Sequence, residues 1–187
     1  MKKAISLLAL FQLFFICLLA QNNLPAVDKS PMDMSYYPAN YPVLKINDKI
    51  TETLAARVVY SRPQKAGRPL FGGLLKYGDL WRMGANEATE IEFFKNVRFD
   101  GKKINKGRYT LYAIVNETSW TIIINKDTDT WGSFKYDAKK DVARKEVTIQ
   151  KTDTILESLA MAFEKTTTGF NLVIGWDNVR TSIPFTF

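Results

Sequence analysis

The residues best suited to bind a ligand lie in one run, residues 77–89, with the sequence Y-G-D-L-W-R-M-G-A-N-E-A-T. The guanidinium group of Arg82 can hold a carboxylate or a phosphate through two parallel hydrogen bonds. The indole of Trp81 offers a flat apolar face that can stack on a ligand. Three shorter polar side chains complete the set, those of Asn86, Glu87 and Thr89. Because a strand is expected from Thr89 onward, a rigid sheet would fix this loop, and we predict a binding site here.

Two more arginines, Arg62 and Arg68, lie in a nearby loop that is rich in proline and glycine, residues 61–73. Together with Arg82 they could bind an acidic ligand. Alternatively, the arginines pair with carboxylates or backbone carbonyls and stabilise the long loops, and the pair between Arg82 and Glu87 is the first candidate for this structural role.

Tyr60 precedes the arginine loop and would flank the site, and Trp131 would form a possible wall. Trp81 and Trp131 are each expected either as exposed surfaces for stacking or as lids over the core, whereas strand alternation places Trp120 and Trp176 in the core. The predicted ligand-binding residues are Tyr60, Arg62, Arg68, Trp81, Arg82, Asn86, Glu87, Thr89 and Trp131.

The composition excludes several kinds of catalysis. The sequence has no histidine, and its single cysteine, Cys17, lies in the N-terminal apolar segment. Mechanisms that pair serine or cysteine with histidine are therefore excluded, as is thiolate–metal chemistry. We predict a non-catalytic domain with no cofactor and no metal. Two alternatives remain: a glycan hydrolase or lyase that uses Glu87 with a second carboxylate or a tyrosine, and, more weakly, a calcium site at residues 127–129.

The N-terminus has the pattern of a secretory signal peptide, with Lys2 and Lys3 before an uncharged apolar run, residues 4–20. Cleavage after Ala20 would leave 167 of the 187 residues and lower the formal charge from +7 to +5. We expect a secreted or periplasmic protein without a stable membrane span, although a membrane anchor is the alternative. Because the basic residues are scattered, no nucleic acid is expected. The expected partner is a small molecule, a glycan or a protein of the cell envelope, and a purely structural role in envelope assembly is a further alternative.

The turns and alternating apolar residues in the rest of the sequence predict an all-β fold. Four prolines in residues 21–50 predict an extended leader without a helix, packed on a single domain, residues 51–187. Residues 74–81 could hold one helical turn, and residues 157–164 a helix instead of a strand. Asp177-Asn178 is a predicted turn. About nine strands would form an antiparallel β-sandwich, with a jelly roll as one form of it, at residues 53–60, 89–95, 97–99, 107–115, 119–126, 145–152, 157–166, 169–177 and 179–185.

Several motifs occur in an order that resembles a known family. They are S-P-M-D-M (30–34), Y-S-R-P (60–63), G-R-P-L-F-G (67–72), residues 77–89 above, G-R-Y-T-L-Y (107–112), W-T-I-I-I-N (120–125) and W-G (131–132). The sequence resembles the secreted bacterial family called domain of unknown function 2911, from about Asp28 to the C-terminus, and W-R-x-G-A-N-E-x-T is the most specific part. This resemblance implies a β-rich exported or envelope protein without an assigned activity, and it supplies no catalytic residues.

Overall fold

The computed structural model describes residues 24–187, so the predicted signal peptide lies outside the described residues. This part of the chain is an antiparallel all-β fold, as predicted, with ten strands in one open sheet where about nine were expected. Its elements are β1 (Met32–Tyr37), α2 (Tyr41–Ile46), β2 (Ala56–Ser61), β3 (Leu80–Trp81), β4 (Glu90–Phe93), β5 (Val97–Phe99), β6 (Lys102–Ile104), β7 (Gly107–Val115), β8 (Ser119–Asn125), the 3-10 helix η1 (Ala138–Lys140), β9 (Asp141–Lys165) and β10 (Gly169–Thr186).

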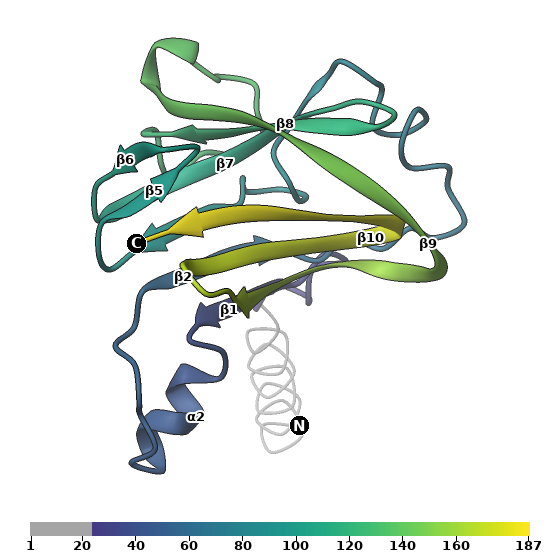
Figure 1. Ribbon diagram of the computed structural model, residues 1–187. Coiled ribbons are helices and arrows are strands. Elements are labelled where there is room, and N and C mark those ends of the chain that lie inside the picture. The colour runs from purple at the N-terminus through teal and green to yellow at the C-terminus, as the bar shows by residue number, and fades with distance from the viewer. Residues whose placement is uncertain (1–23) are drawn as a thin grey trace, which may run out of the picture.

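The strands follow the order β1-β2-β4-β7-β8-β9-β10-β5-β6, and β3 pairs with β7 beside this path. The long strand β9 connects two layers (Figure 1). Its first part pairs with β8, from Asn125↔Asp141 to Ser119↔Thr148, and its later part pairs with β10, from Ile149↔Thr181 to Lys165↔Phe170. The sheet therefore turns over on itself, and its two inner faces enclose the core.

Aromatic side chains fill the space between the layers. Tyr37 of β1 stacks on Phe170 of β10 with ring centroids 4.5 Å apart. On the inner face of β10, Phe170, Leu172, Ile174 and Trp176 are buried, and Val173 and Gly175 on the other face are buried as well. Trp120 and Trp176 are both buried, so their prediction as core residues is confirmed.

The two longest strands differ from the prediction. The segments predicted as 145–152 and 157–166 form one strand, β9, so the helix alternative at 157–164 is wrong. The segments predicted as 169–177 and 179–185 likewise form β10. Asp177 is not a turn: its φ of 54° and the register shifts on both sides of it mark a bulge inside the strand.

The leader also differs. The prediction of no helix is wrong, because α2 begins at Tyr41 with Pro42 in its first turn, where the missing N–H has no intrahelical partner to lose. Before it, β1 pairs with β2 along its whole length, from Met32↔Ser61 to Tyr37↔Ala56. The possible helical turn at residues 74–81 does not form, and turns lead there into the short strand β3.

Candidate functional site

The loop after β3, residues 82–88, is held in place by its own ends. Trp81 pairs with Ala113 of β7, and its Nε1 donates a hydrogen bond to the carbonyl of Gly84 at 3.2 Å. Thr89 closes the loop from the other side: its Oγ1 donates to the carbonyl of Met83 at 2.8 Å, and its N–H donates to the carbonyl of Arg82 at 3.0 Å. The loop is thus a compact turn on the end of the sheet.

Ser61 of β2 fixes the middle of this loop. Its hydroxyl accepts a hydrogen bond from Ala85 N–H at 2.6 Å and donates one to the Ala85 carbonyl at 2.7 Å. A Cβ atom on Gly84 would lie 2.7 Å from this hydroxyl oxygen, so only glycine fits there. Met83 and Asn86 have φ of 58° and 59°, the left-handed region that is unfavourable for residues other than glycine. Such backbone persists only where the surroundings enforce it, as these contacts do.

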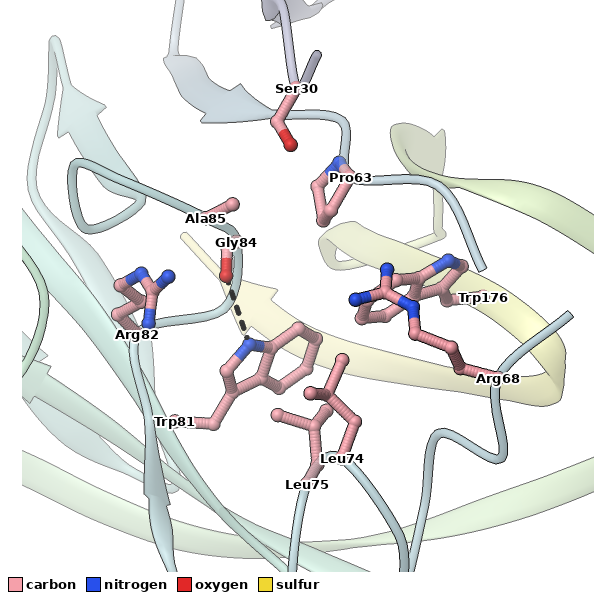
Figure 2. A pocket seen from close by; sticks show the side chains of 10 residues that line it. All are labelled: Ser30, Pro63, Arg68, Leu74, Leu75, Trp81, Arg82, Gly84, Ala85 and Trp176. Carbon is pink, nitrogen blue, oxygen red and sulfur yellow. Dashed lines mark hydrogen bonds between the residues drawn. The ribbon is translucent and has the colours of Figure 1, made fainter. Parts of the chain in front are cut away.

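A recess of about 290 Å³ opens beside this loop (Figure 2). Trp81 and Trp176 are both buried and form its inner side, while the exposed residues Arg68 and Leu74 mark its solvent side. The residues that line it are Ser30, Pro63, Arg68, Leu74, Leu75, Trp81, Arg82, Gly84, Ala85 and Trp176.

Two guanidinium groups lie on opposite sides of the recess in Figure 2. Arg68 is positioned by its own loop, because its Nε donates to the carbonyl of Lys65 at 3.0 Å and its Nη2 to that of Gln64 at 2.6 Å. Among residues 24–187, neither Arg68 nor Arg82 forms an ion pair. The recess is therefore a site of positive charge without a protein counter-charge.

The side chain of Arg82 also has a hydrogen-bond donor without an acceptor. Its Nε is buried and has no hydrogen-bond partner in the described part of the chain. Burial lowers the pKa of the Arg82 guanidinium, although an arginine side chain stays protonated in proteins. A buried donor without an acceptor costs free energy, so the protein's own contacts do not fully stabilise the Arg82 side chain.

Tyr60, Arg62 and Thr89, three of the predicted site residues, do not line the recess. Tyr60 is buried; its hydroxyl accepts a hydrogen bond from the N–H of Met161 at 3.0 Å, and burial raises its pKa. Arg62 forms an ion pair with Asp33 at 3.0 Å and does not line the recess. Thr89 is buried in the loop closure described above. The structural role considered for the arginines therefore describes Arg62, through Asp33, and Arg68, through the carbonyls of Lys65 and Gln64, but not Arg82.

Asn86, Glu87 and Trp131 also lie outside the recess. The carbonyl of Asn86 accepts a hydrogen bond from Gly132 N–H at 2.9 Å, and Glu87 pairs with Trp131 in an isolated β-bridge. Glu87 is exposed and lines a separate hollow of about 170 Å³. The predicted ion pair between Arg82 and Glu87 is wrong, since the ion pairs within residues 24–187 do not include either residue. Trp131 is 62% exposed, in contrast to Trp81 at 3%.

The sequence did not indicate several residues of the recess. Trp176 was correctly placed in the core by strand alternation, which gave no sign that its ring also faces a recess. Ser30 and Pro63 reach the recess only because the leader and the end of β2 fold over it. No local pattern reveals such long-range neighbours.

Within residues 24–187, no group of three or more acidic, histidine or cysteine side chains is placed to hold a metal ion. At the alternative calcium site, Asp127 is paired with Lys140 at 2.8 Å and Asp129 with Arg108. The same residues include no helix that is long and apolar enough to cross a membrane.

Fold and recess together define an all-β domain with an arginine-lined pocket. The family model described as "Protein of unknown function (DUF2911)" matches residues 42–185, and the chain belongs to this family. The resemblance found in the sequence is thereby confirmed. Comparison with the curated proteins and with the solved structures gives no match.

Proposed function

We propose that this protein is an exported, non-catalytic ligand-binding domain whose recess holds an anionic group between Arg68 and Arg82. The observation that supports this proposal is the pair of guanidinium groups that face one recess without a carboxylate partner. Proteins usually pair an arginine charge that is partly buried, so the unpaired charge of Arg82 at this recess favours an external anion. The proposal of export rests on the basic and apolar pattern of residues 2–20.

The size and lining of the recess limit the ligand. A volume of about 290 Å³ is at the lower end for small-molecule sites, which are roughly 300–1,000 Å³. It suits a compact group with a carboxylate or phosphate and a flat apolar part against Trp81 and Trp176. The ligand would be a small acidic metabolite, or the acidic part of an envelope glycan, peptide or protein.

The carboxylate-dependent hydrolase finds less support. Glu87 lines a different hollow from Trp81 and Arg82, so the predicted acid and the predicted binding residues do not face one space. A purely structural role accounts for the hydrogen bonds of Arg68 to the carbonyls of Lys65 and Gln64, but not for Arg82, whose buried Nε has no acceptor within residues 24–187.

Calorimetry and thermal unfolding with a panel of anions test the proposal: phosphate, succinate, benzoate, glucuronate and a peptide ending in aspartate. We expect at least one anion to bind and to raise the melting temperature. The affinity should fall at least about tenfold in Arg82→Ala and in Arg68→Ala, because each loses a charged hydrogen bond to the anion.

The matched control is Arg98→Ala, which removes an equal charge from an exposed arginine whose Nη1 also donates to a backbone carbonyl, that of Gly101. Its anion affinity should equal that of the wild type. If no anion in the panel binds, or if the Arg68→Ala/Arg82→Ala double variant binds anions as well as Arg98→Ala does, the proposal is refuted.

A further inference from the structure

A third hollow, of about 430 Å³, lies along the loop between β8 and β9 and shares no residue with the arginine recess. Two large aromatic side chains of this loop are exposed, Trp131 at 62% and Phe134 at 84%. Neighbouring exposed aromatic rings on a protein surface mark an interaction site more often than single ones do. The residues that line the hollow are Tyr112, Asp127, Thr128, Asp129, Thr130, Trp131, Gly132, Phe134, Lys135 and Tyr136.

These rings are exposed on an ordered loop. The Thr130 carbonyl accepts a hydrogen bond from Ala88 N–H at 3.0 Å, and Gly132 N–H donates to Asn86 at 2.9 Å. The Phe134 ring lies so close to Gly132 that an added Cβ would approach it to 2.6 Å. A ligand would therefore meet rings whose backbone is already fixed, which lowers the entropic cost of binding.

The polar groups of the hollow are close to neutral as a set. Asp127 is paired with Lys140, and Asp129 with Arg108. The Tyr136 hydroxyl donates to Asp141 at 2.7 Å and accepts from Arg144. The hollow thus offers hydroxyl and carboxylate oxygens as acceptors, together with the ammonium donor of Lys135, without the excess of positive charge found in the arginine recess.

We propose that this hollow is a binding site for a neutral oligosaccharide. A pyranose ring has an apolar face of C–H groups, which matches an exposed indole or phenyl ring, and a rim of hydroxyl groups that need donors and acceptors nearby. Trp131 and Phe134 supply the rings, and the paired carboxylates, Thr128 and Lys135 supply the polar rim.

The backbone pairing of the loop argues against a peptide as the ligand. A peptide that adds a strand needs free N–H and C=O groups on an edge. Here the carbonyl of Thr130 and the N–H of Gly132 are already bonded to residues 86–88, so recognition has to come from side chains. This inference does not depend on the proposed function of the arginine recess.

Binding is to be measured by calorimetry with cellohexaose, chitohexaose, xylohexaose, laminarihexaose, mannohexaose and maltohexaose. We expect at least one of them to bind the wild type, and its affinity to fall at least about tenfold in Trp131→Ala, which corresponds to about 1.4 kcal/mol. Phe134→Ala is the second variant, and it should weaken the same interaction. Both variants should keep the wild-type melting temperature because both rings are exposed.

Two controls separate this site from other surfaces. Ile46→Ala removes an apolar side chain that is 83% exposed on α2, and Arg68→Ala/Arg82→Ala removes the charges of the recess. Both should bind the oligosaccharide like the wild type. The proposal is overturned if none of the six oligosaccharides binds, or if Trp131→Ala and Phe134→Ala bind as well as Ile46→Ala.

Discussion

Trp81 and Trp176 stack with their ring centroids 6.0 Å apart and an interplanar angle of 20°, although β3 and β10 are not neighbours in the sheet. Trp120 meets Trp81 edge-on at 5.5 Å and 84°, which extends the contact into the core. The inner side of the recess is therefore also a junction between the two layers. A substitution of Trp81 or Trp176 therefore affects both stability and binding. Arg68 and Arg82 can be substituted without disturbing this junction.

Trp81→Ala should be strongly destabilising. The side chain is buried and contacts two other tryptophans, so its loss leaves a cavity, with an expected cost of about 3–5 kcal/mol. Urea unfolding measures this change, and Trp131→Ala serves as the matched control. Because Trp131 is exposed, its truncation should change the free energy of unfolding by less than about 0.5 kcal/mol. Equal unfolding midpoints for the two variants would contradict the placement of Trp81 in the core.

Arg82→Met should not destabilise the protein, and we expect a gain of up to about 1 kcal/mol. Methionine keeps the apolar stem and removes a partly buried charge whose Nε has no acceptor. The control is Arg62→Met, which loses the ion pair to Asp33 and the hydrogen bond to the Leu159 carbonyl and should lower the melting temperature. A lower melting temperature for Arg82→Met would show that Arg82 has a structural role, and it would weaken the case for an external anion.

Ser61→Ala tests the support of the recess loop. The substitution leaves both the N–H and the carbonyl of Ala85 without their partner, which should cost about 1–3 kcal/mol. It should also weaken anion binding, because residues 82–88 lose the contact that fixes them. Ser35→Ala removes a single hydrogen bond, to the Met161 carbonyl, away from the recess. It should lower stability less and leave anion affinity unchanged. Unchanged anion affinity in Ser61→Ala would mean that the loop holds its shape without this contact.

Local pattern was sufficient for much of the fold. The strands at residues 97–99 and 107–115 have the predicted bounds, since alternation and glycine-containing turns define them. The pattern failed at Asp177, where an Asp-Asn pair has the composition of a turn but lies in a bulge. Lys65 forms an ion pair with Asp177 at 2.6 Å, a contact across 112 positions of the chain that no local window contains.

Local sequence pattern also predicts only part of the recess, because long-range contacts decide the rest. Residue type and loop position singled out Trp81, Arg82 and Arg68, and the structure brings these three to one recess. Residue type could not separate Arg68 from Arg62, because the difference lies in their partners. Arg62 reaches Asp33 of β1, a neighbour only after β1 pairs with β2. Which arginine is left without a counter-charge is decided by tertiary structure.

The raised pKa of Tyr136 predicts a loss of folding stability at high pH. Burial first, and then its hydrogen bond to Asp141, raise the pKa of Tyr136 to about 12, whereas a tyrosine in the unfolded chain titrates near 10. Between these values the unfolded chain releases a proton that the folded protein keeps, so stability falls as pH rises. The contribution of Tyr136 is therefore fully present below about pH 10 and is lost as pH rises to about 12.

Tyr136→Phe should flatten this part of the stability profile, and the difference from the wild type isolates it from other buried tyrosines such as Tyr60 and Tyr112, whose pKa values are also raised. Ultraviolet titration of tyrosinate gives an independent measurement. Asp141→Asn removes the negative acceptor and should lower the pKa of Tyr136. If Tyr136→Phe shows the same decline as the wild type over this range, the Tyr136 hydroxyl does not keep its proton in the folded state.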